Sequence, residues 1–432
     1  MKGFDAYCGI IASAGHRRGA QMGVLRVDHP DIGDFILAKQ NGNQLTRFNI
    51  SVAITDEFME SVARNGTFDL KFKGKGYRTV DAGELWEKIM RSTYDYAEPG
   101  VIFIDRMNYW NNLWYAEKII GTNPCGEVPL PPFGACLLGS FNLTKYIKKA
   151  ADGVGFYFDV DQFIADIPTV VRAMDNVIDR CRYPLPEQKA EEVTKRRIGL
   201  GVAGLANAAE AQGYAYGSPQ FLAFERAVHT TLRDESYRAS IALAKEKGSF
   251  ALFDSERYLA GKFIQTLPDD IRDGIARDGL RNSHLLSDAP TGTISMCADN
   301  ISGGIEPVFA HTVDRPIYTQ DGHQIERLED YGMKFFGVRG RLADEVSAEE
   351  HVDVLITAQK YVDQAISKTV NMDGQKMSWD AFKGIYMRAY DGGAKGCATF
   401  NKSGKRMALL TSATETGAAC SIDPLTGHKE CA

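Results

Sequence analysis

The chain has 432 residues, of which 44% are hydrophobic and 25% charged, and its formal net charge is −6. This ordinary globular composition excludes a disordered chain, a collagen-like fibre and a small disulfide scaffold. The mild acidity disfavours nonspecific nucleic-acid binding, which needs a basic face. No apolar run approaches the ~20 residues that span a bilayer, and the first residues do not form a secretory signal. We therefore expect a cytoplasmic protein without membrane contact, whose eight cysteines are mostly thiols.

The predicted elements alternate between strands and helices along the chain. The segment 4–11 is typical of a helix end, residues 14–19 of a loop, and the ranges 21–27, 48–54 and 100–105 of strands. Helices are expected at 80–96, 160–180, 203–213, 220–247, 347–368 and 378–391. This order favours a mainly parallel α/β architecture. Because the tail from Thr411 onward is small and polar without an amphipathic period, we expect a folded domain over 1–410 and a mobile arm over 411–432.

The first candidate site is the string Asn123-Pro124-Cys125-Gly126-Glu127. Pro124 opposes a regular helix and biases Asn123 toward an extended conformation. Side chains alternate in an extended segment, so Asn123, Cys125 and Glu127 are expected on one face within about 7 Å. That face would present a hydrogen-bond anchor, a sulfur reagent and a proton acceptor. For an isolated Cys-Gly-Glu, a turn with a buried cysteine is the alternative.

The other cysteines fall into three groups. Cys136 follows Cys125 by eleven positions and lies on the next expected strand, although a cysteine in an apolar run is usually a small core residue. Cys420 and Cys431 lie on the expected mobile arm, where two thiols could exchange with a disulfide. A zinc site would need closer ligands, and two incidental exposed thiols are the alternative. A structural role is expected for the remaining thiols, Cys8, Cys181, Cys297 and Cys397.

Two further segments are candidates for phosphate recognition. The first is a loop of small hydroxyl residues around a glycine, whose N–H and O–H groups can surround a phosphate: Pro290, Thr291, Gly292, Thr293, Ile294 and Ser295. The second is a glycine-hinged loop within 14–20 with two guanidinium groups that could grip a phosphate or stack on a base: Gly15, His16, Arg17, Arg18 and Gly19. A threonine-rich turn and a solvated basic loop are the respective alternatives.

Taken together, these segments resemble the catalytic subunit of ribonucleotide reductases, most closely the adenosylcobalamin-dependent class II. The matching stretches run in family order over almost the whole chain. They include SAGHRRGAQMGVLRVDHPDIGDFI, TNPCGEVPLPPFGACLLGSFNL, RRIGLGVAGLA, APTGTIS and GGIEPVFA. The resemblance implies a ten-stranded α/β barrel of the type shared with glycyl radical enzymes, with residues 123–127 at the tip of a central finger loop.

The resemblance also implies the chemistry. Cys125 would carry the transient thiyl radical that removes the 3′-hydrogen of the ribonucleotide. Glu127 would take the 3′-hydroxyl proton, Asn123 would hydrogen-bond the sugar, and the 2′-hydroxyl would leave as water. Cys136 would be one of two cysteines that supply the electrons by forming a disulfide. Cys420 and Cys431 would re-reduce that pair and be recharged by a thioredoxin-like or glutaredoxin-like partner.

Substrate and effector sites follow from the same resemblance. Residues 290–295 would hold the phosphates of a ribonucleoside di- or triphosphate. The loop 14–20 would relay the identity of a bound dNTP or ATP effector to the substrate base. Where relatives carry a longer polar pair, this chain has Ala12 and Ser13, so effector specificity stays open.

The cofactor class can be argued from residues within the resemblance. The stretch Lys395–Phe400 lacks the tyrosine pair that iron-dependent relatives need, and Glu127 with a thiol tail argues against the anaerobic glycyl-radical class. Adenosylcobalamin remains as the expected cofactor. The eight histidines show no spacing typical of metal ligands, so no protein-held metal is predicted.

One departure from the family bears on completeness. Relatives normally carry a segment before residue 1 with the first barrel strands, the other reducible cysteine, part of the phosphate site and the first effector loop. We therefore expect a barrel that is incomplete at its N-terminus. Either a separate polypeptide from a split gene completes it, or the reading frame is truncated. A homodimer is a further possibility. The alternative function is a noncatalytic nucleotide-binding fragment or one half of a split reductase.

Overall fold

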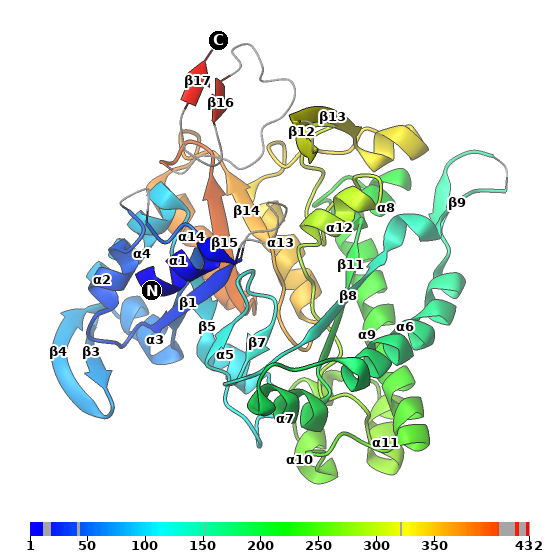
Figure 1. The fold of residues 1–432 in the computed structure, drawn as a ribbon, viewed down its shortest axis with the longest axis horizontal. Helices are drawn as coiled ribbons and strands as arrows, with labels where there is room; N and C mark the ends of the chain where they lie inside the picture. The colour runs from blue at the N-terminus through cyan, green and yellow to red at the C-terminus, as the bar shows by residue number, and fades with distance from the viewer. Residues whose placement is uncertain are drawn as a thin grey trace.

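The computed structural model describes residues 1–11, 19–40, 44–151, 153–319, 322–405, 420–422 and 429–431. Within 314–326 and 420–431 it describes the backbone alone. Figure 1 shows strands in the middle of the molecule with helices around them.

The strands are β1 (Gln21–Arg26), β2 (Phe48–Ile54), β3 (Thr67–Phe72), β4 (Lys75–Asp81), β5 (Gly100–Phe103), β6 (Gly121–Thr122), β7 (Pro129–Leu130), β8 (Leu137–Asn142), β9 (Ile147–Lys149), β10 (Phe156–Phe158), β11 (Ile198–Ala203), β12 (Thr312–Thr319), β13 (Gly322–Glu329), β14 (Thr369–Met372), β15 (Gly396–Asn401), β16 (Cys420–Ile422) and β17 (Lys429–Cys431). The helices are α1 (Lys2–Ile10), α2 (Ile32–Leu37), α3 (Asp56–Ala63), α4 (Ala82–Tyr96), α5 (Ile104–Tyr109), α6 (Val160–Arg180), α7 (Pro186–Lys195), α8 (Leu205–Ala211), α9 (Pro219–Lys247), α10 (Ser255–Leu259), α11 (Asp269–Asp278), α12 (Gly292–Cys297), α13 (Ala348–Gln359) and α14 (Trp379–Asp391).

The central strands form two groups. Strands within a group run parallel, and the two groups run antiparallel to each other where they join. In one group, β1 pairs with β2 and β2 with β5, all parallel. In the other, β14 pairs in parallel with β15, and β8 with β11. The two groups join where β15 runs antiparallel to β5. Crossover helices join most of the parallel strands, as parallel pairing requires.

The segments 284–288 and 364–367 connect β11 to β14. Leu200 of β11 forms a parallel bridge with Leu286, and Asp288 forms one with Ile366. The strands therefore continue from β8 through β11, these two segments, β14, β15, β5 and β2 to β1. Among the residues that the structure describes, no pairing joins β1 back to β8, so the ring is not closed and the ten-strand expectation stays a prediction.

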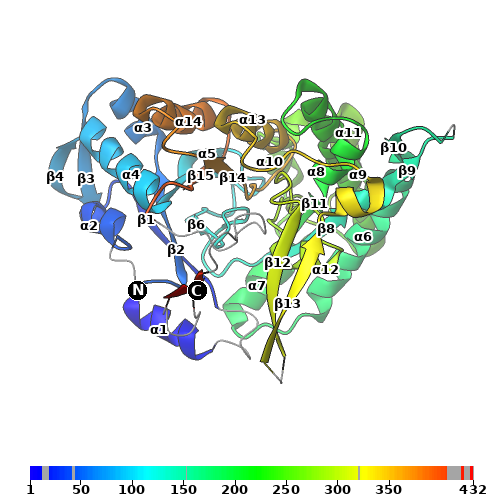
Figure 2. The same ribbon diagram turned by 90° about the horizontal axis from the view of Figure 1, so that it is seen from above.

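The short hairpin of β6 and β7 lies between these strand groups. Figure 2 shows it with β1 and β2 on one side and β8 and β11 on the other. Contacts agree on both sides. Asn49 of β2 donates a hydrogen bond to the Pro124 carbonyl at 2.8 Å, and the Ala365 N–H donates one to the Glu127 carbonyl at 3.0 Å.

Helices pack on the outside of the strands and bury the core. Figure 2 shows α3, α4 and α14 beside the β1–β15 side and α6 and α9 beside β8 and β11. Their starts follow from local sequence: Asp81 caps α4, Ser218 caps α9, and Ser347 with Glu350 forms a capping box on α13. Large side chains with no exposed surface fill the core, including those of Phe163, Tyr237 and Phe382.

Most predicted elements are confirmed, with shifted ends. The parallel α/β architecture is present, as are strands at 21–26 and 48–54 and helices at 160–180 and 379–391. The strand at 100 ends at Phe103 because α5 begins at Ile104. The helix expected over 347–368 is wrong beyond Gln359: the following buried segment 364–367 bridges the strand at 284–288 instead. Hairpins β3–β4, β9–β10 and β12–β13 were not predicted.

Candidate functional site

The Asn123–Glu127 string forms the turn of the β6–β7 hairpin, and the expected extended conformation is wrong. The Gly126 N–H bonds the Asn123 carbonyl at 3.0 Å, and Gly126 has φ +85°, a value that glycine adopts without strain. The turn breaks the alternation of side chains. As a result Cys125 is exposed at the tip, whereas Glu127 is only 2% exposed. The three side chains do not share one face.

Asn123 and Glu127 do come together at the base of the hairpin. The Asn123 Oδ1 accepts a hydrogen bond from the Val128 N–H at 3.0 Å, which closes the turn. Burial raises the pKa of the Glu127 carboxyl above its ordinary value, and the Glu127 backbone N–H and then the Asn123 side chain oppose only part of the rise. Among the residues that the structure describes, one carboxylate oxygen, Oε2, is buried without a hydrogen-bond partner.

The base of the hairpin is anchored to the second strand group. The Glu127 carbonyl accepts hydrogen bonds from the Ser287 hydroxyl at 2.9 Å and from the Ala365 N–H at 3.0 Å. Ser287 and Ala365 lie on the two segments that connect β11 to β14. The hairpin therefore has a fixed base and an exposed thiol at its tip.

Cys136 lies immediately before β8 rather than on it. A Cβ placed on Gly199 of β11 would be 3.1 Å from the Cys136 Sγ and 2.8 Å from the Ser287 Cβ. The same Ser287 holds the Glu127 carbonyl. Cys136 and the residue that holds the base of the β6–β7 hairpin therefore lie beside the same residue of β11.

The chemical state of Cys136 is set by its surroundings. Burial raises the pKa of its thiol well above the ordinary value, and the Arg197 guanidinium opposes only part of this rise. The Cys136 Sγ lies 3.8 Å from the Leu137 carbonyl oxygen, which accepts its weak hydrogen bond. Cys136 is thus a protonated thiol at neutral pH.

Residues 290–295 do not form the expected loop. Thr291 has φ +52°, and the short helix α12 begins at Gly292. The Thr291 hydroxyl bonds the Ser295 hydroxyl and accepts from the Gly304 N–H, both at 2.8 Å, and these bonds fix the turn that starts the helix. Two of the hydroxyls are therefore buried and already paired. Gly292 and Thr293 are exposed, and the space beside Gly292 is open.

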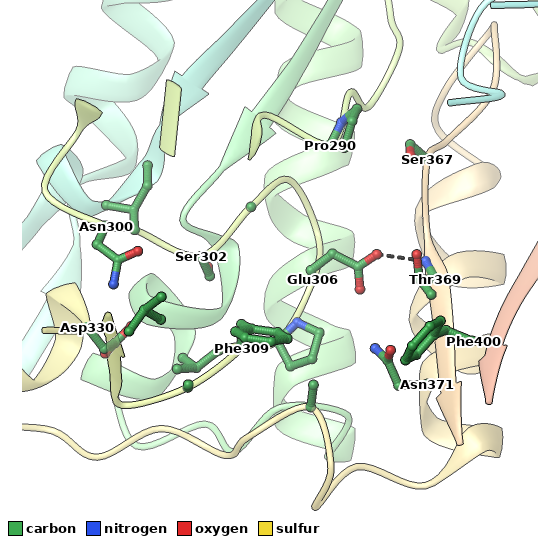
Figure 3. A pocket seen from close by; sticks show the side chains of 17 residues that line it. Pro290, Asn300, Ser302, Glu306, Phe309, Asp330, Ser367, Thr369, Asn371 and Phe400 are labelled. Carbon is green, nitrogen blue, oxygen red and sulfur yellow. Dashed lines mark hydrogen bonds between the residues drawn. The ribbon is translucent and has the colours of Figure 1, made fainter. Parts of the chain in front are cut away.

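A cavity of about 450 Å³ opens next to this turn, within the ~300–1,000 Å³ range of small-molecule sites. Figure 3 shows Phe309, Asn371 and Phe400 around it, with Glu306 directed toward Thr369. Among the described residues that line it, none is basic, and two, Glu306 and Asp330, are acidic. The Ser302 hydroxyl is buried there without a hydrogen-bond partner in the described part of the chain. Aromatic rings, an unpaired hydroxyl and no cation suit an uncharged ring system better than a phosphate.

Two buried ionic groups behind this cavity were missed from the sequence. Glu306 forms an ion pair with Lys368, whose Nζ lies 2.8 Å from the His351 Nδ1. The His229 Nε2 on α9 hydrogen-bonds the Asp288 Oδ2 at 2.9 Å. Asp288 lies two residues before Pro290. Burial by itself lowers the pKa of His229, but the Asp288 carboxylate raises it to about 9. These residues are far apart in sequence, so no local motif marks them.

Several predicted residues lie outside what the structure describes. Gly15, His16, Arg17 and Arg18 fall in the undescribed segment 12–18, and Gly19 follows it. In the tail, β16 and β17 pair antiparallel with Cys420 opposite Cys431. Of the cysteines expected to be structural, Cys397 is in the core, Cys8 is half-buried, and Cys181 and Cys297 are exposed.

Two features are absent from the part of the chain that the structure describes. No cluster of three or more His, Cys, Asp or Glu residues suited to a metal ion occurs there. None of its helices is long and apolar enough to cross a membrane.

Comparison with known proteins identifies what the chain is similar to. The family model described as "Ribonucleotide reductase, barrel domain" matches residues 1–334 and 324–400. The vitamin B12-dependent ribonucleoside-diphosphate reductase of Thermoplasma acidophilum is 33% identical over 96% of this chain and 55% of its own length. The Mycobacterium tuberculosis (strain CDC 1551) protein of the same name is 34% identical over 95% of this chain and 60% of its own length.

A more distant relative has a similar name. The vitamin B12-dependent ribonucleotide reductase of Streptomyces clavuligerus is 28% identical over 94% of this chain and 51% of its own length. The chain thus spans between about half and three fifths of the curated relatives that it matches.

Proposed function

This chain belongs to the ribonucleotide reductase barrel-domain family, and from that premise we propose that it carries the ribonucleotide-reducing barrel of an adenosylcobalamin-dependent reductase. The hairpin of β6 and β7, called the finger hairpin below, carries the proposal. It presents the Cys125 thiol at an exposed tip and keeps a carboxyl with an unpaired oxygen, that of Glu127, at its buried base. The substrate is a ribonucleoside di- or triphosphate.

In the proposed reaction, a thiyl radical at Cys125 takes the 3′-hydrogen atom and becomes a thiol. Glu127 accepts the 3′-hydroxyl proton, and the raised pKa of its carboxyl makes it a stronger base than an exposed glutamate. Asn123 hydrogen-bonds the sugar. Two cysteine thiols, one of them Cys136, give two electrons and two protons and become a disulfide. One proton leaves with the 2′-hydroxyl as water, and the other hydrogen takes its place at C2′. The Cys125 thiol then returns its hydrogen atom to C3′ and is a thiyl radical again, and Glu127 returns the proton to the 3′-hydroxyl.

The cavity next to Pro290 fits part of the cofactor. Phe309 and Phe400 offer faces for an uncharged purine, and the unpaired Ser302 hydroxyl and the Asn371 amide offer hydrogen bonds. We assign these residues to the adenosyl group, because the volume suits a nucleoside rather than a whole corrin ring. When bound, adenosylcobalamin supplies the one-electron chemistry that turns the Cys125 thiol into a radical.

The remaining roles follow the family resemblance. The turn at 290–295, where Gly292 and Thr293 are exposed, holds substrate phosphates, and the loop 14–20 reads a dNTP or ATP effector. Cys420 and Cys431 re-reduce the disulfide at Cys136 and are recharged by a thioredoxin-like or glutaredoxin-like protein. A separate polypeptide that pairs with the outer edges of β1 and β8, or a second copy of the chain, is the proposed partner.

The test measures deoxyribonucleotide formed from a ribonucleotide, adenosylcobalamin and dithiothreitol. The chain is assayed alone and with a polypeptide that supplies the strands proposed beside β1 and β8. We expect cofactor-dependent product, loss of turnover in Cys125→Ser, and full turnover in Cys181→Ser, whose thiol is also exposed but lies at the end of α6. Product that persists in Cys125→Ser contradicts the proposal.

The open edges of β1 and β8 favour one second candidate, a half of a split reductase that binds nucleotide without turning it over by itself. Nucleotide binding by the chain alone, with turnover only after the second polypeptide is added, is the result expected for it. Full turnover by a stable monomer rejects this candidate.

A further inference from the structure

The carboxylate of Glu306 lines the cavity beside Pro290, and the protein uses only part of its hydrogen-bonding capacity. Its Oε1 accepts a hydrogen bond from the Thr369 N–H at 2.6 Å, and its Oε2 pairs with the Lys368 ammonium. A carboxylate oxygen can accept two hydrogen bonds. Within the part of the chain that the structure describes, each Glu306 oxygen therefore keeps one acceptor position, and the side chain is 24% exposed.

Lys368 holds Glu306 from behind and does not line the cavity. Its side chain has no exposed surface, and its ammonium donates to Glu306, to the His351 Nδ1 and to the Thr369 carbonyl. An ammonium has three donors, so all of them are used. The ion pair therefore presents only its carboxylate to the cavity, and this arrangement suits hydroxyl donors rather than a phosphate.

The backbone around Glu306 is also held by the fold. The Glu306 N–H donates to the Gly303 carbonyl at 2.7 Å, and the Ile305 carbonyl accepts from the Tyr216 hydroxyl at 2.7 Å. The Tyr216 side chain has no exposed surface. The carboxylate is thus placed before any ligand arrives, which lowers the entropy that binding would cost.

The second acidic residue at the cavity, Asp330, shows what a purely structural carboxylate looks like here. Asp330 is 2% exposed, and its oxygens accept hydrogen bonds from the Asn207 side chain and from the N–H groups of Gly332 and Met333. The fold alone accounts for that carboxylate. The Glu306 carboxylate, in contrast, is divided between the fold and the cavity.

We propose that Glu306 recognises the 2′,3′-diol of the adenosyl ribose, with each carboxylate oxygen accepting a hydrogen bond from one hydroxyl. The inference rests on the proposed function, in which this cavity holds the adenosyl group. Figure 3 shows Glu306 near Phe309 and Phe400, the rings offered to the adenine. The buried Ser302 hydroxyl lines the same cavity and lacks a partner among the described residues, so it also points to a polar ligand. Carboxylates bind ribose hydroxyls in the same way in dinucleotide-binding folds.

The first experiment measures nucleoside binding to the full chain by equilibrium dialysis, without cobalamin and without turnover. The probes are 5′-deoxyadenosine, 2′,5′-dideoxyadenosine and 3′,5′-dideoxyadenosine. Because a hydrogen bond to a charged acceptor is worth about tenfold or more in affinity, each missing hydroxyl should weaken binding by about tenfold. Equal affinities for the three nucleosides, or no measurable binding of 5′-deoxyadenosine, overturn the inference. A Glu306 that only holds the fold together would give equal affinities.

The second experiment repeats the series with variants. Glu306→Gln should reduce the discrimination to a few-fold, because a neutral acceptor makes weaker hydrogen bonds than a carboxylate. Asp330→Asn, which removes the same charge from the same cavity, should keep the wild-type discrimination. Because Glu306→Gln leaves Lys368 buried without a carboxylate, the double variant Glu306→Gln, Lys368→Met is the test protein if the single variant does not fold. Wild-type discrimination in a folded variant that lacks the Glu306 carboxylate overturns the inference.

A competition measurement separates the adenosyl ribose from the ribose of the substrate. Saturating cytidine diphosphate should not weaken binding of 5′-deoxyadenosine, whereas competition between them would assign Glu306 to the substrate and overturn the inference. The outcomes also separate the inference from the proposed function. Hydroxyl discrimination in a protein that makes no deoxyribonucleotide supports the inference and rejects the proposed reaction, and product formed by a protein without discrimination overturns the inference alone.

Discussion

Gly201 of β11 offers the sharpest test of how the site is packed. A Cβ on Gly201 would lie 2.4 Å from the Ser287 carbonyl oxygen, 2.7 Å from the Asp288 Oδ1 and 3.0 Å from the Asp288 Cα. Two of these atoms are backbone, so a change of rotamer cannot relieve the contact. Gly201→Ala must push the segment 284–288 away from β11.

The size of the effect follows from the displacement. The nearest contact must open from 2.4 Å to at least 3.4 Å, where ordinary van der Waals contact begins. Overpacking of this kind costs about 1–3 kcal/mol. The shift also strains the Ser287 N–H bond to Leu200 and the Val202 N–H bond to Asp288, each worth about 1 kcal/mol. We expect Gly201→Ala to lower the free energy of unfolding by about 3–5 kcal/mol.

Equilibrium urea unfolding, followed by circular dichroism, measures this loss. Gly384→Ala is the matched control, because Gly384 is exposed in the middle of α14 and a Cβ there meets no atom within 4 Å. Alanine should stabilise that helix by about 0.5–1 kcal/mol. A folded Gly201→Ala that loses less than about 1 kcal/mol would refute the reasoning.

Three further predictions concern the residues around Cys136 and the finger. Because burial raises the pKa of Glu192 from 4.5 to about 8, its contribution to stability is full below pH 4.5 and lost as the pH rises to 8. The free energy of unfolding of the wild-type protein should therefore fall between pH 5 and pH 8, and in Glu192→Gln this fall should be smaller by on the order of 4 kcal/mol. An equal fall in both proteins, measured by urea unfolding, contradicts this. Glu117→Gln should cost about 3–5 kcal/mol in urea unfolding, since it leaves Lys195 and Arg197 buried without their shared carboxylate; a loss within 1 kcal/mol would be inconsistent with that. Ser287→Ala should lower the free energy of unfolding by about 1 kcal/mol, because the Glu127 carbonyl loses one of its two hydrogen bonds and keeps the other. The loosened hairpin should also let Cys125 be alkylated faster; slower alkylation would count against an anchoring role of Ser287.

The sequence predicted the structure well where a local residue pattern by itself determines the secondary structure. The parallel α/β architecture follows from alternating periodicities, and the strands at 21–26 and 48–54 agree with the prediction to within a residue. The family membership was predictable because the motifs are long and specific.

Local rules failed where a single residue decides the backbone. Gly126 at positive φ turns the NPCGE string into a hairpin tip, and alternation of side chains does not survive such a turn. At 290–295, the mutual bond of the Thr291 and Ser295 hydroxyls uses groups that the pattern offered to a ligand. Both errors come from treating side chains as available before their backbone was known.

Long-range groups could not be predicted at all. His229 meets Asp288 across 59 positions of sequence, and Glu192 is buried although its helix has an ordinary charged sequence. In a sequence, a buried glutamate is indistinguishable from an exposed one such as Glu187. Only the tertiary packing around α7 makes Glu192 exceptional.

The turn at Gly126 lets the hairpin expose one side chain and bury another, which a single extended face could not do. In the proposed reaction, a thiol that exchanges hydrogen atoms with two different molecules must be reachable, and Cys125 is exposed at the tip. The proposed proton acceptor is a stronger base when burial raises its pKa, and Glu127 is buried at the base of the hairpin. The thiol thus stays accessible while the carboxyl two residues away is tuned by burial; exposing Glu127 should lower its pKa and weaken the proposed proton transfer.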